Sequence, residues 1–186
     1  MSEEIDLDDI ERRMSGGVEA LRKELSSLRT GRASSTMLDP VVVNVYGADM
    51  PLNQIATISV PEARLISVQV WDSNNTSAAE KAIRNSGLGL NPAAEGSLIR
   101  VPIPDLTEER RREYSKVAGQ YAENARIAVR NIRRHAMDEL KKQEKAGDIS
   151  QDDQHLYGDE VQTLTDGTIK EIDSMLEQKQ QEIMQV

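Results

Sequence analysis

The hydrophobic positions form three stretches with helical spacing, which flank one stretch with strand spacing. In residues 3–29 they recur in alternating steps of four and three, which is typical of a helix that buries a narrow seam. The seam positions are Met14, Val18, Leu21, Leu25 and Leu28. Residues 149–184 keep the same three-and-four spacing, and Ser150 followed by Asp153 is typical of a helix start. Both stretches predict helices with one buried side.

The longest helical stretch is residues 107–146, which contain no proline. At 1.5 Å per residue it predicts a single rod of ~60 Å. Its apolar residues fall within a stripe of about 140° around the helix axis, wide enough to face a core. The stripe comprises Tyr114, Val117, Ala118, Tyr121, Ala125, Ala128, Val129, Ile132, Ala136 and Leu140. Thr107 suits the N-cap and Gly147 suits the residue after the helix end.

The opposite side of this rod is basic. It carries Arg112, Lys116, Arg126, Arg130, Arg133, Arg134 and Lys141. A solvated surface is the usual role of such charges, but arginines clustered on one side fit it poorly. A guanidinium group can bind two phosphate oxygens at once, whereas lysine acts as a point charge. The pattern therefore favours contact with a polyanion.

The middle of the chain changes to strand spacing. Strands are expected at 41–46, 55–60, 65–71 and 98–101, with a turn at 47–49, a helix at 78–86 and a turn-rich connector at 87–96. Trp71 is expected in the core or at its edge. Strands, helix and strand within about 70 residues predict a compact α+β unit.

These elements predict an α+β fold of two domains. None of the three flanking helices can bury its stripe alone, so residues 1–30 and 105–186 are expected to form a discontinuous three-helix bundle. Residues 31–104 are then an inserted domain, joined by two linkers in an L-shaped molecule. Two-stranded linkers permit rotation of one domain on the other. The expected hinge comprises Thr30, Gly31, Arg32, Pro102, Pro104 and Asp105.

Composition excludes several classes of protein. The chain has no cysteine and no apolar run approaching a membrane span, and its acidic start does not resemble a secretory signal. We therefore expect a cytoplasmic protein without disulfides. His135 and His155 are isolated, so no metal site is expected. No nucleophile is paired with a base and no glycine-rich loop has phosphate-binding context, so we expect neither enzymatic activity nor a cofactor.

Charge is distributed unevenly. The net charge is −9 over 186 residues, which alone argues against binding to nucleic acid. Between Arg110 and Arg134, however, eight Lys and Arg residues face two acids, so this segment carries +6 and the remainder −15. Such asymmetry indicates one face for a polyanion on a body that repels it elsewhere.

Five segments resemble the bacterial ribosome recycling factor family, in order and nearly end to end. They are Arg29-Thr-Gly-Arg-Ala33, Gly87-Leu-Gly-Leu-Asn-Pro92, Arg100-Val-Pro-Ile-Pro104, Leu106-Thr-Glu-Glu-Arg-Arg111 and Val129-Arg-Asn-Ile-Arg-Arg134. The resemblance implies an L-shaped, tRNA-like monomer made of a three-helix bundle and a small β/α/β domain.

The resemblance also implies a function. Members of the family recycle ribosomes after termination: they bind the 70S ribosome and its large subunit and, with GTP-bound elongation factor G, split the post-termination complex to release mRNA and tRNA. The bundle would contact 23S rRNA and the inserted domain would face elongation factor G.

Candidate rRNA-binding residues combine this resemblance with the basic side of the rod. Arg130 and Arg133 match the family's RNA-facing arginines, Arg29 and Arg32 match those beside the hinge, and Arg110 matches another. Arg126 and Arg134 join them from the basic side. Asp105 and His135 depart from the family's usual residues, and a change in hinge stiffness is expected from Asp105 alone.

Two other classes of function remain as alternatives. A helical chaperone or scaffold would use exposed apolar edges of the helices, and its binding would survive nuclease treatment of its partner. An enzyme in the inserted domain would need convergent polar residues, which the sequence does not provide.

Overall fold

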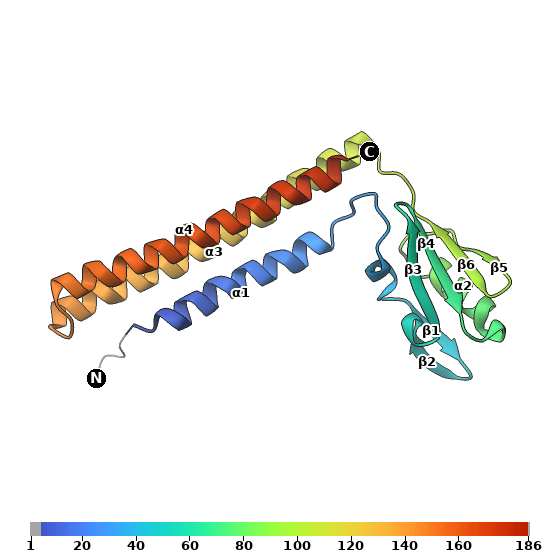
Figure 1. The fold of residues 1–186 in the computed structure, drawn as a ribbon, viewed down its shortest axis with the longest axis horizontal. Coiled ribbons are helices and arrows are strands. Elements are labelled where there is room, and N and C mark those ends of the chain that lie inside the picture. The colour runs from blue at the N-terminus through green and yellow to red at the C-terminus, as the bar shows by residue number, and fades with distance from the viewer. Residues whose placement is uncertain (1–4, 186) are drawn as a thin grey trace. The chain divides into compact units, whose positions relative to one another are not determined.

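The computed structural model describes residues 5–185, which form two compact units (Figure 1). One comprises the chain up to Thr30 together with Glu108–Gln185, and the other comprises Gly31–Thr107. The first unit is helical and the second contains both strands and a helix. The expected α+β fold class is therefore confirmed. Within the described residues, no helix combines the length and hydropathy needed to cross a bilayer.

The first unit is a bundle of three helices, α1 (Leu7–Ser26), α3 (Glu108–Ala146) and α4 (Gln151–Met184), each packed on the other two. Helix α1 is capped by Asp6, whose carboxylate accepts hydrogen bonds from the N–H groups of Asp8 and Asp9. Ser150 caps α4 in the same way, as its sequence predicts, by accepting from the N–H of Asp153. Gly147 has a φ of 78°, a conformation that glycine adopts readily, and it ends α3 where expected.

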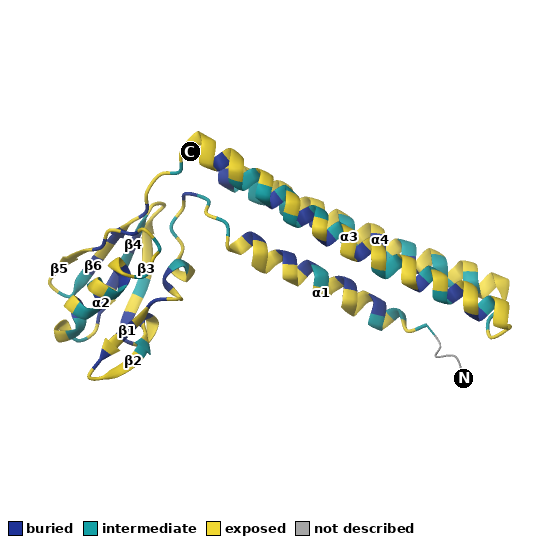
Figure 2. Cartoon of the chain, turned by 180° about the vertical axis from the view of Figure 1, so that it is seen from behind, coloured by how far each residue is buried: buried dark blue, intermediate teal, exposed yellow. Residues whose placement is uncertain are grey.

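The bundle core follows the predicted seam of α1. Met14, Val18, Leu21 and Leu25 are buried, while Leu28 is half-buried against the same core. Figure 2 shows the buried residues along the inner sides of these helices and exposed residues along the outer sides. Helix α3 contributes small side chains to this core, namely Ala118, Ala122, Ala125, Val129 and Ala136. Such small residues let neighbouring helices approach closely.

One position in the predicted stripe of α3 is wrong. Ala128 is exposed, and Ala122, which the stripe omitted, is buried. Helix α3 packs against two neighbours rather than one, so the buried surface is set by both contacts and not by a single stripe.

Arg111 joins the start of α3 to the end of α4. Its side chain is buried, and its Nη1 donates hydrogen bonds to the carbonyl oxygens of Ile183, at 2.7 Å, and Gln185, at 2.6 Å. The last carbonyls of a helix have no partner within the helix, and a cation is favoured there. Arg111 therefore caps the C-terminal end of α4.

The second unit has two antiparallel sheets. Strands β1 (Val42–Val45) and β2 (Ala48–Pro51) form a hairpin. Strands β3 (Ala56–Glu62), β4 (Leu65–Val70), β5 (Ala93–Glu95) and β6 (Leu98–Pro102) form a sheet in the order β3-β4-β6-β5. Helix α2 (Thr76–Arg84) packs on β1, β5 and β6. Short 3-10 helices span Ser35–Leu38, Leu52–Gln54 and Ser73–Asn75. Alternate residues of β4 and β6, such as Ile66, Val68 and Ile99, fill the core.

Three expectations for this unit are corrected. The hairpin turn is Tyr46-Gly47, and residues 48 and 49 belong to β2. The connector at 87–96 contains the edge strand β5. Trp71 is 63% exposed rather than in the core. The alternation of β4 explains this exposure, because Val70 points inward and its neighbour must point outward.

Both chain segments that connect this unit to the bundle are bonded to the turn between β3 and β4. The N–H of Ala33 donates to the carbonyl of Ala63 at 2.7 Å, and the N–H of Ile103 donates to the carbonyl of Arg64 at 2.8 Å. The Arg64 side chain also forms an ion pair with Asp105. These bonds attach the two connecting segments to one corner of the second unit.

Candidate nucleic-acid interface

Three arginines lie within five residues on the surface of α3. Arg130, Arg133 and Arg134 are spaced three and four positions apart, so they share one face of the helix. Arg130 and Arg134 are exposed and Arg133 is half-buried. We call these three residues the arginine face. They stand on the middle of a 39-residue helix whose other sides pack on α1 and α4, so their backbone positions are rigidly held.

Arg133 is oriented by α4. Its Nε donates to the Oε1 of Gln162 at 2.6 Å, and the Nε2 of Gln162 donates to Asp166 at 2.8 Å. Neither Nη group of Arg133 has a partner among residues 5–185. The side chain is thus fixed at its Nε while its paired Nη groups stay available. A fixed guanidinium fork loses little conformational entropy when it binds a phosphate.

Arg130 and Arg134 are held more loosely. Arg130 is 54% exposed and lies 3.4 Å from Glu123, at the long end of an ion pair. Arg134 donates to the side-chain oxygen of Asn131 at 3.0 Å, a neutral group that leaves its charge uncompensated. An exposed ion pair contributes about 0–1 kcal/mol, so a phosphate can displace Glu123 from Arg130 at small cost.

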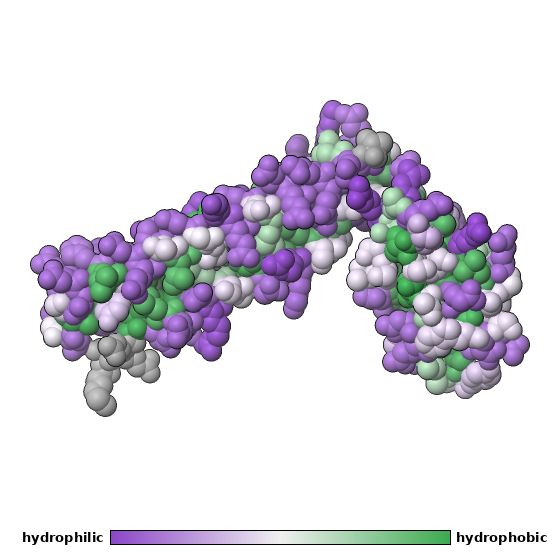
Figure 3. Space-filling view, viewed as in Figure 1, coloured by the Kyte–Doolittle hydropathy of each residue, from purple (hydrophilic) through white to green (hydrophobic). Residues whose placement is uncertain are grey.

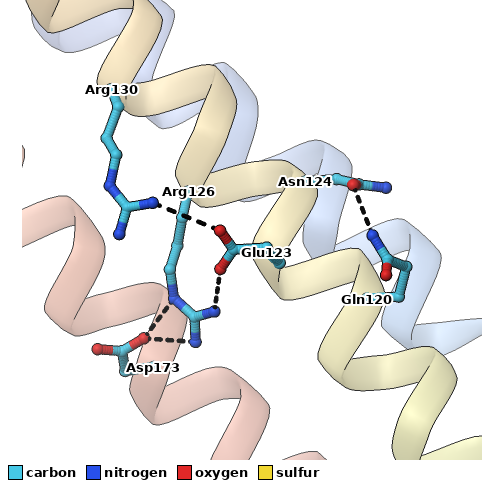
Figure 4. Close-up of polar contacts among 6 residues, drawn as sticks. All are labelled: Gln120, Glu123, Asn124, Arg126, Arg130 and Asp173. Atoms are coloured by element: carbon cyan, nitrogen blue, oxygen red, sulfur yellow. Dashed lines mark hydrogen bonds and ion pairs between the residues drawn. The ribbon is translucent and has the colours of Figure 1, made fainter.

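Arg126 has a different environment, shown in Figure 4. It is only 19% exposed and lies between Glu123 of its own helix, at 2.9 Å, and Asp173 of α4, at 2.7 Å. Burial alone lowers the pKa of its guanidinium. The hydrogen bonds to Asp173 and Glu123 and their negative charges outweigh burial, so this pKa lies above its ordinary value. Arg126 therefore connects α3 to α4, and its charge is balanced within the bundle.

The other predicted basic residues lie on different elements. Arg110 is exposed in the first turn of α3, where it forms an ion pair with Glu113 at 3.5 Å. Arg29 follows α1 in the first unit, and Arg32 follows Gly31 in the second; both are exposed. These three residues are not part of the arginine face, although each is accessible.

The predicted hinge residues do not all lie at the boundary between the two units. Gly31 is buried and has a φ of 76°, which favours glycine. Pro102 pairs with Leu65 in the sheet, and Asp105 is ion-paired with Arg64. Both therefore belong to the second unit, whereas Thr30 and Gly31 lie where the division between the units falls.

Some groups that shape this site were not found from the sequence. Gln162 and Asp173 lie on α4, and their relation to α3 depends on how the two helices are aligned, which spacing within one helix does not reveal. The charge balance around Arg126 could be partly anticipated, since Glu123 precedes it by three residues and such pairs meet on a helix. Within the described residues, no group of three or more metal-ligating side chains exists.

Comparison with known proteins places the chain among its relatives. The family model described as ribosome recycling factor matches residues 21–184. The ribosome-recycling factor of Maricaulis maris (strain MCS10) is 58% identical over the full length of both chains. That of Rhodospirillum centenum (strain ATCC 51521 / SW) is 61% identical over 98% of this chain and 99% of its own.

Two solved structures that resemble this chain are also of ribosome recycling factors. A solution structure of the ribosome recycling factor has a TM-score of 0.74 at 42% identity, covering 98% of this chain and all of the other. A second structure models the T. thermophilus ribosome recycling factor with E. coli elongation factor G on the E. coli post-termination complex. It has a TM-score of 0.62 at 44% identity, covering 97% of this chain and 100% of that one. The matches extend over both units, and the chain belongs to the ribosome recycling factor family.

Proposed function

We propose that this chain recycles ribosomes after termination by binding the large subunit through the arginine face and, with elongation factor G and GTP, separating the subunits. Family membership supports the reaction. A relative that shares 44% of its residues is described on the post-termination complex together with elongation factor G. The chain acts by binding and movement and carries out no chemical step of its own.

The arginine face is the observation that carries the RNA contact. Arg130, Arg133 and Arg134 present guanidinium groups on a rigid helix of an otherwise acidic chain. Only Arg130 has a carboxylate partner among the described residues, and that contact is long and exposed. Phosphate oxygens match such forks in charge and geometry. Arg29, Arg32 and Arg110 are proposed as further contacts, whereas Arg126 is proposed to stabilise the bundle first.

The body of the molecule would then help to set its orientation. Subtracting the +6 of residues 110–134 from the net charge of −9 leaves −15 on the rest of the chain. Negative charge is repelled by ribosomal phosphates, so approach by any other face is disfavoured. Elongation factor G, facing residues 31–104, would provide the energy of GTP hydrolysis for splitting.

Charge reversal tests the RNA contact. We expect Arg133→Glu to abolish co-sedimentation with 70S ribosomes and with isolated large subunits, because it removes the fixed fork and introduces repulsion. Arg13→Glu, on an exposed position of α1, makes the same charge change away from α3 and should retain binding. Circular dichroism should show that both variants remain helical. Normal binding by Arg133→Glu would refute the assigned contact.

We also propose that the linkers act as a hinge during splitting. The bonds from Ala33 and Ile103 tie both segments to the turn after β3. The flexible positions are then proposed on the bundle side of those bonds, at Thr30, Gly31 and Arg32 and at residues after Asp105, with Pro102 and Pro104 stiffening the return segment.

A further inference from the structure

A groove between α1 and α4 is lined by residues of these two helices and by no residue of the arginine face. It has a volume of about 380 Å³. Its lining residues are Leu7, Asp8, Glu11, Leu156, Asp159, Glu160, Thr163 and Leu164. On α1 they are spaced one and four positions apart, and on α4 three, four, seven and eight, so each helix contributes one continuous face. The RNA contact proposed above does not use this surface.

The floor of the groove is apolar. Leu7 and Leu164 are half-buried and continue the core of the bundle outward, and Leu156 is 56% exposed beside them. A single exposed leucine is ordinary on a protein surface, but a hollow that joins three leucines provides a seat for an apolar side chain. Figure 3 shows hydrophobic surface exposed between hydrophilic margins along the bundle.

The rim of the groove is acidic. Asp8 and Glu11 stand on α1, and Asp159 and Glu160 stand on α4. None of these four carboxylates forms an ion pair within residues 5–185, although many acids elsewhere on the bundle do. Four uncompensated negative charges around one hollow repel phosphate and attract cations. The groove therefore does not suit RNA.

We propose that this acidic groove binds a basic protein segment, in which Lys or Arg residues flank a large aliphatic side chain. The aliphatic group would occupy the space above Leu7, Leu156 and Leu164, and the cations would meet the carboxylates on both sides. This combination of an apolar anchor and complementary rim charges is typical of peptide recognition by helical grooves. The molecule would thus contact RNA with α3 and a basic protein with α1 and α4.

The test uses the full-length protein and a labelled amphipathic peptide of leucine, lysine and alanine, with leucines at helical spacing. Fluorescence anisotropy gives its Kd. Because each surface ion pair contributes about 0–1 kcal/mol, the double variant Glu11→Gln/Glu160→Gln should weaken binding about fivefold to tenfold. The matched control Glu24→Gln/Glu177→Gln changes two exposed acids on the same two helices and should alter Kd less than twofold.

The apolar seat is tested separately. Leu156→Ser should weaken binding by a similar factor, whereas Ile127→Ser, a 47% exposed aliphatic residue on α3, should not. Amide shifts in NMR spectra should map the peptide to residues 7–11 and 156–164. Equal weakening by both glutamine pairs, shifts centred on another surface, or no binding at millimolar peptide would overturn the proposal. None of these results would affect ribosome binding through Arg133.

Discussion

Arginines of similar spacing on α3 have different roles because their neighbours differ. Arg133 is bonded through its Nε to the neutral amide of Gln162, which orients the side chain and leaves its charge available. Arg126 lies seven residues, about two turns, earlier on the same helix, yet Asp173 and Glu123 neutralise it. The helical spacing places both on one side of α3, and their different partners, Gln162 for Arg133 and Asp173 with Glu123 for Arg126, separate the two roles.

This difference leads to an expectation for Arg126. Replacing it by Gln should lower the free energy of unfolding by about 1 kcal/mol, because Asp173 and Glu123 lose a partly buried cation. Urea denaturation measures the change. Ribosome co-sedimentation should fall far less than for Arg133→Glu. A loss of binding equal to that of Arg133→Glu, with unchanged stability, would instead make Arg126 an RNA contact.

In the second unit, the hydrogen bond between Tyr46 and Asp72 can be tested through the pKa of the tyrosine. Its hydroxyl donates to a carboxylate oxygen of Asp72 at 2.9 Å, and this bond, with the charge of Asp72, raises the pKa of Tyr46 above its ordinary value of 10.0. The raised pKa belongs to the folded state. The bond therefore stabilises the fold below pH 10 and loses this effect as the pH rises through the raised pKa.

Absorbance titration of the tyrosines should show one phenol that ionises above the ordinary pKa of 10.0. Asp72→Asn should return the pKa of that group toward 10.0, because it removes the negative charge beside the phenol. Asp49→Asn, which alters a carboxylate that binds Asn44 in the same hairpin, should leave the late ionisation in place. A titration unaffected by Asp72→Asn would contradict the assignment.

At the scale of elements, regular spacing was the reliable guide. The seam of α1 was predicted because steps of four and three keep Met14, Val18, Leu21 and Leu25 on one side. Caps at Ser150 and Gly147 followed from residue types that favour those positions. The hairpin turn was displaced because its first residue is Tyr46, with a φ of 53°. Tight turns of this kind favour Asn, Asp or Gly there, so a tyrosine does not signal one.

The site could be predicted only in part for a related reason. Spacing along α3 identified the basic side, since it depends on one helix alone. The partners from α4, Gln162 and Asp173, depend on how two helices are aligned along their length. That alignment follows from the complete packing of Ala118, Ala122, Val129 and their neighbours, and no short pattern encodes it.

Arg111 is expected to stabilise the C-terminal end of α4. Arg111→Met should keep most of the buried volume but leave the carbonyls of Ile183 and Gln185 without their cation. We expect a loss of about 1–3 kcal/mol. Hydrogen exchange should accelerate in the last turns of α4. Arg112→Met, at an exposed position paired with Glu108, is the control and should change neither quantity measurably.

For the whole molecule, the proposed hinge rests on Gly31. A valine there must adopt a positive φ, which costs an L-residue roughly 1–2 kcal/mol or more. We expect Gly31→Val to slow subunit splitting by the protein with elongation factor G and GTP, measured by light scattering. Gly87→Val, at a φ of 77° with open space around the added side chain, should lower stability similarly without slowing splitting. Equal splitting rates for the two variants would remove Gly31 from the hinge.

The interrupted order of the bundle has a consequence for biosynthesis. Helix α1 leaves the ribosome first, but Glu108, where α3 begins, follows Ser26 by about 80 residues. At about 5–20 residues per second, the leucines and valine of α1 wait roughly 4–16 s for the first helix that can cover them. The inserted unit can fold during that interval, whereas the bundle must assemble after it. We therefore expect chaperones that recognise exposed aliphatic helices to bind the nascent chain.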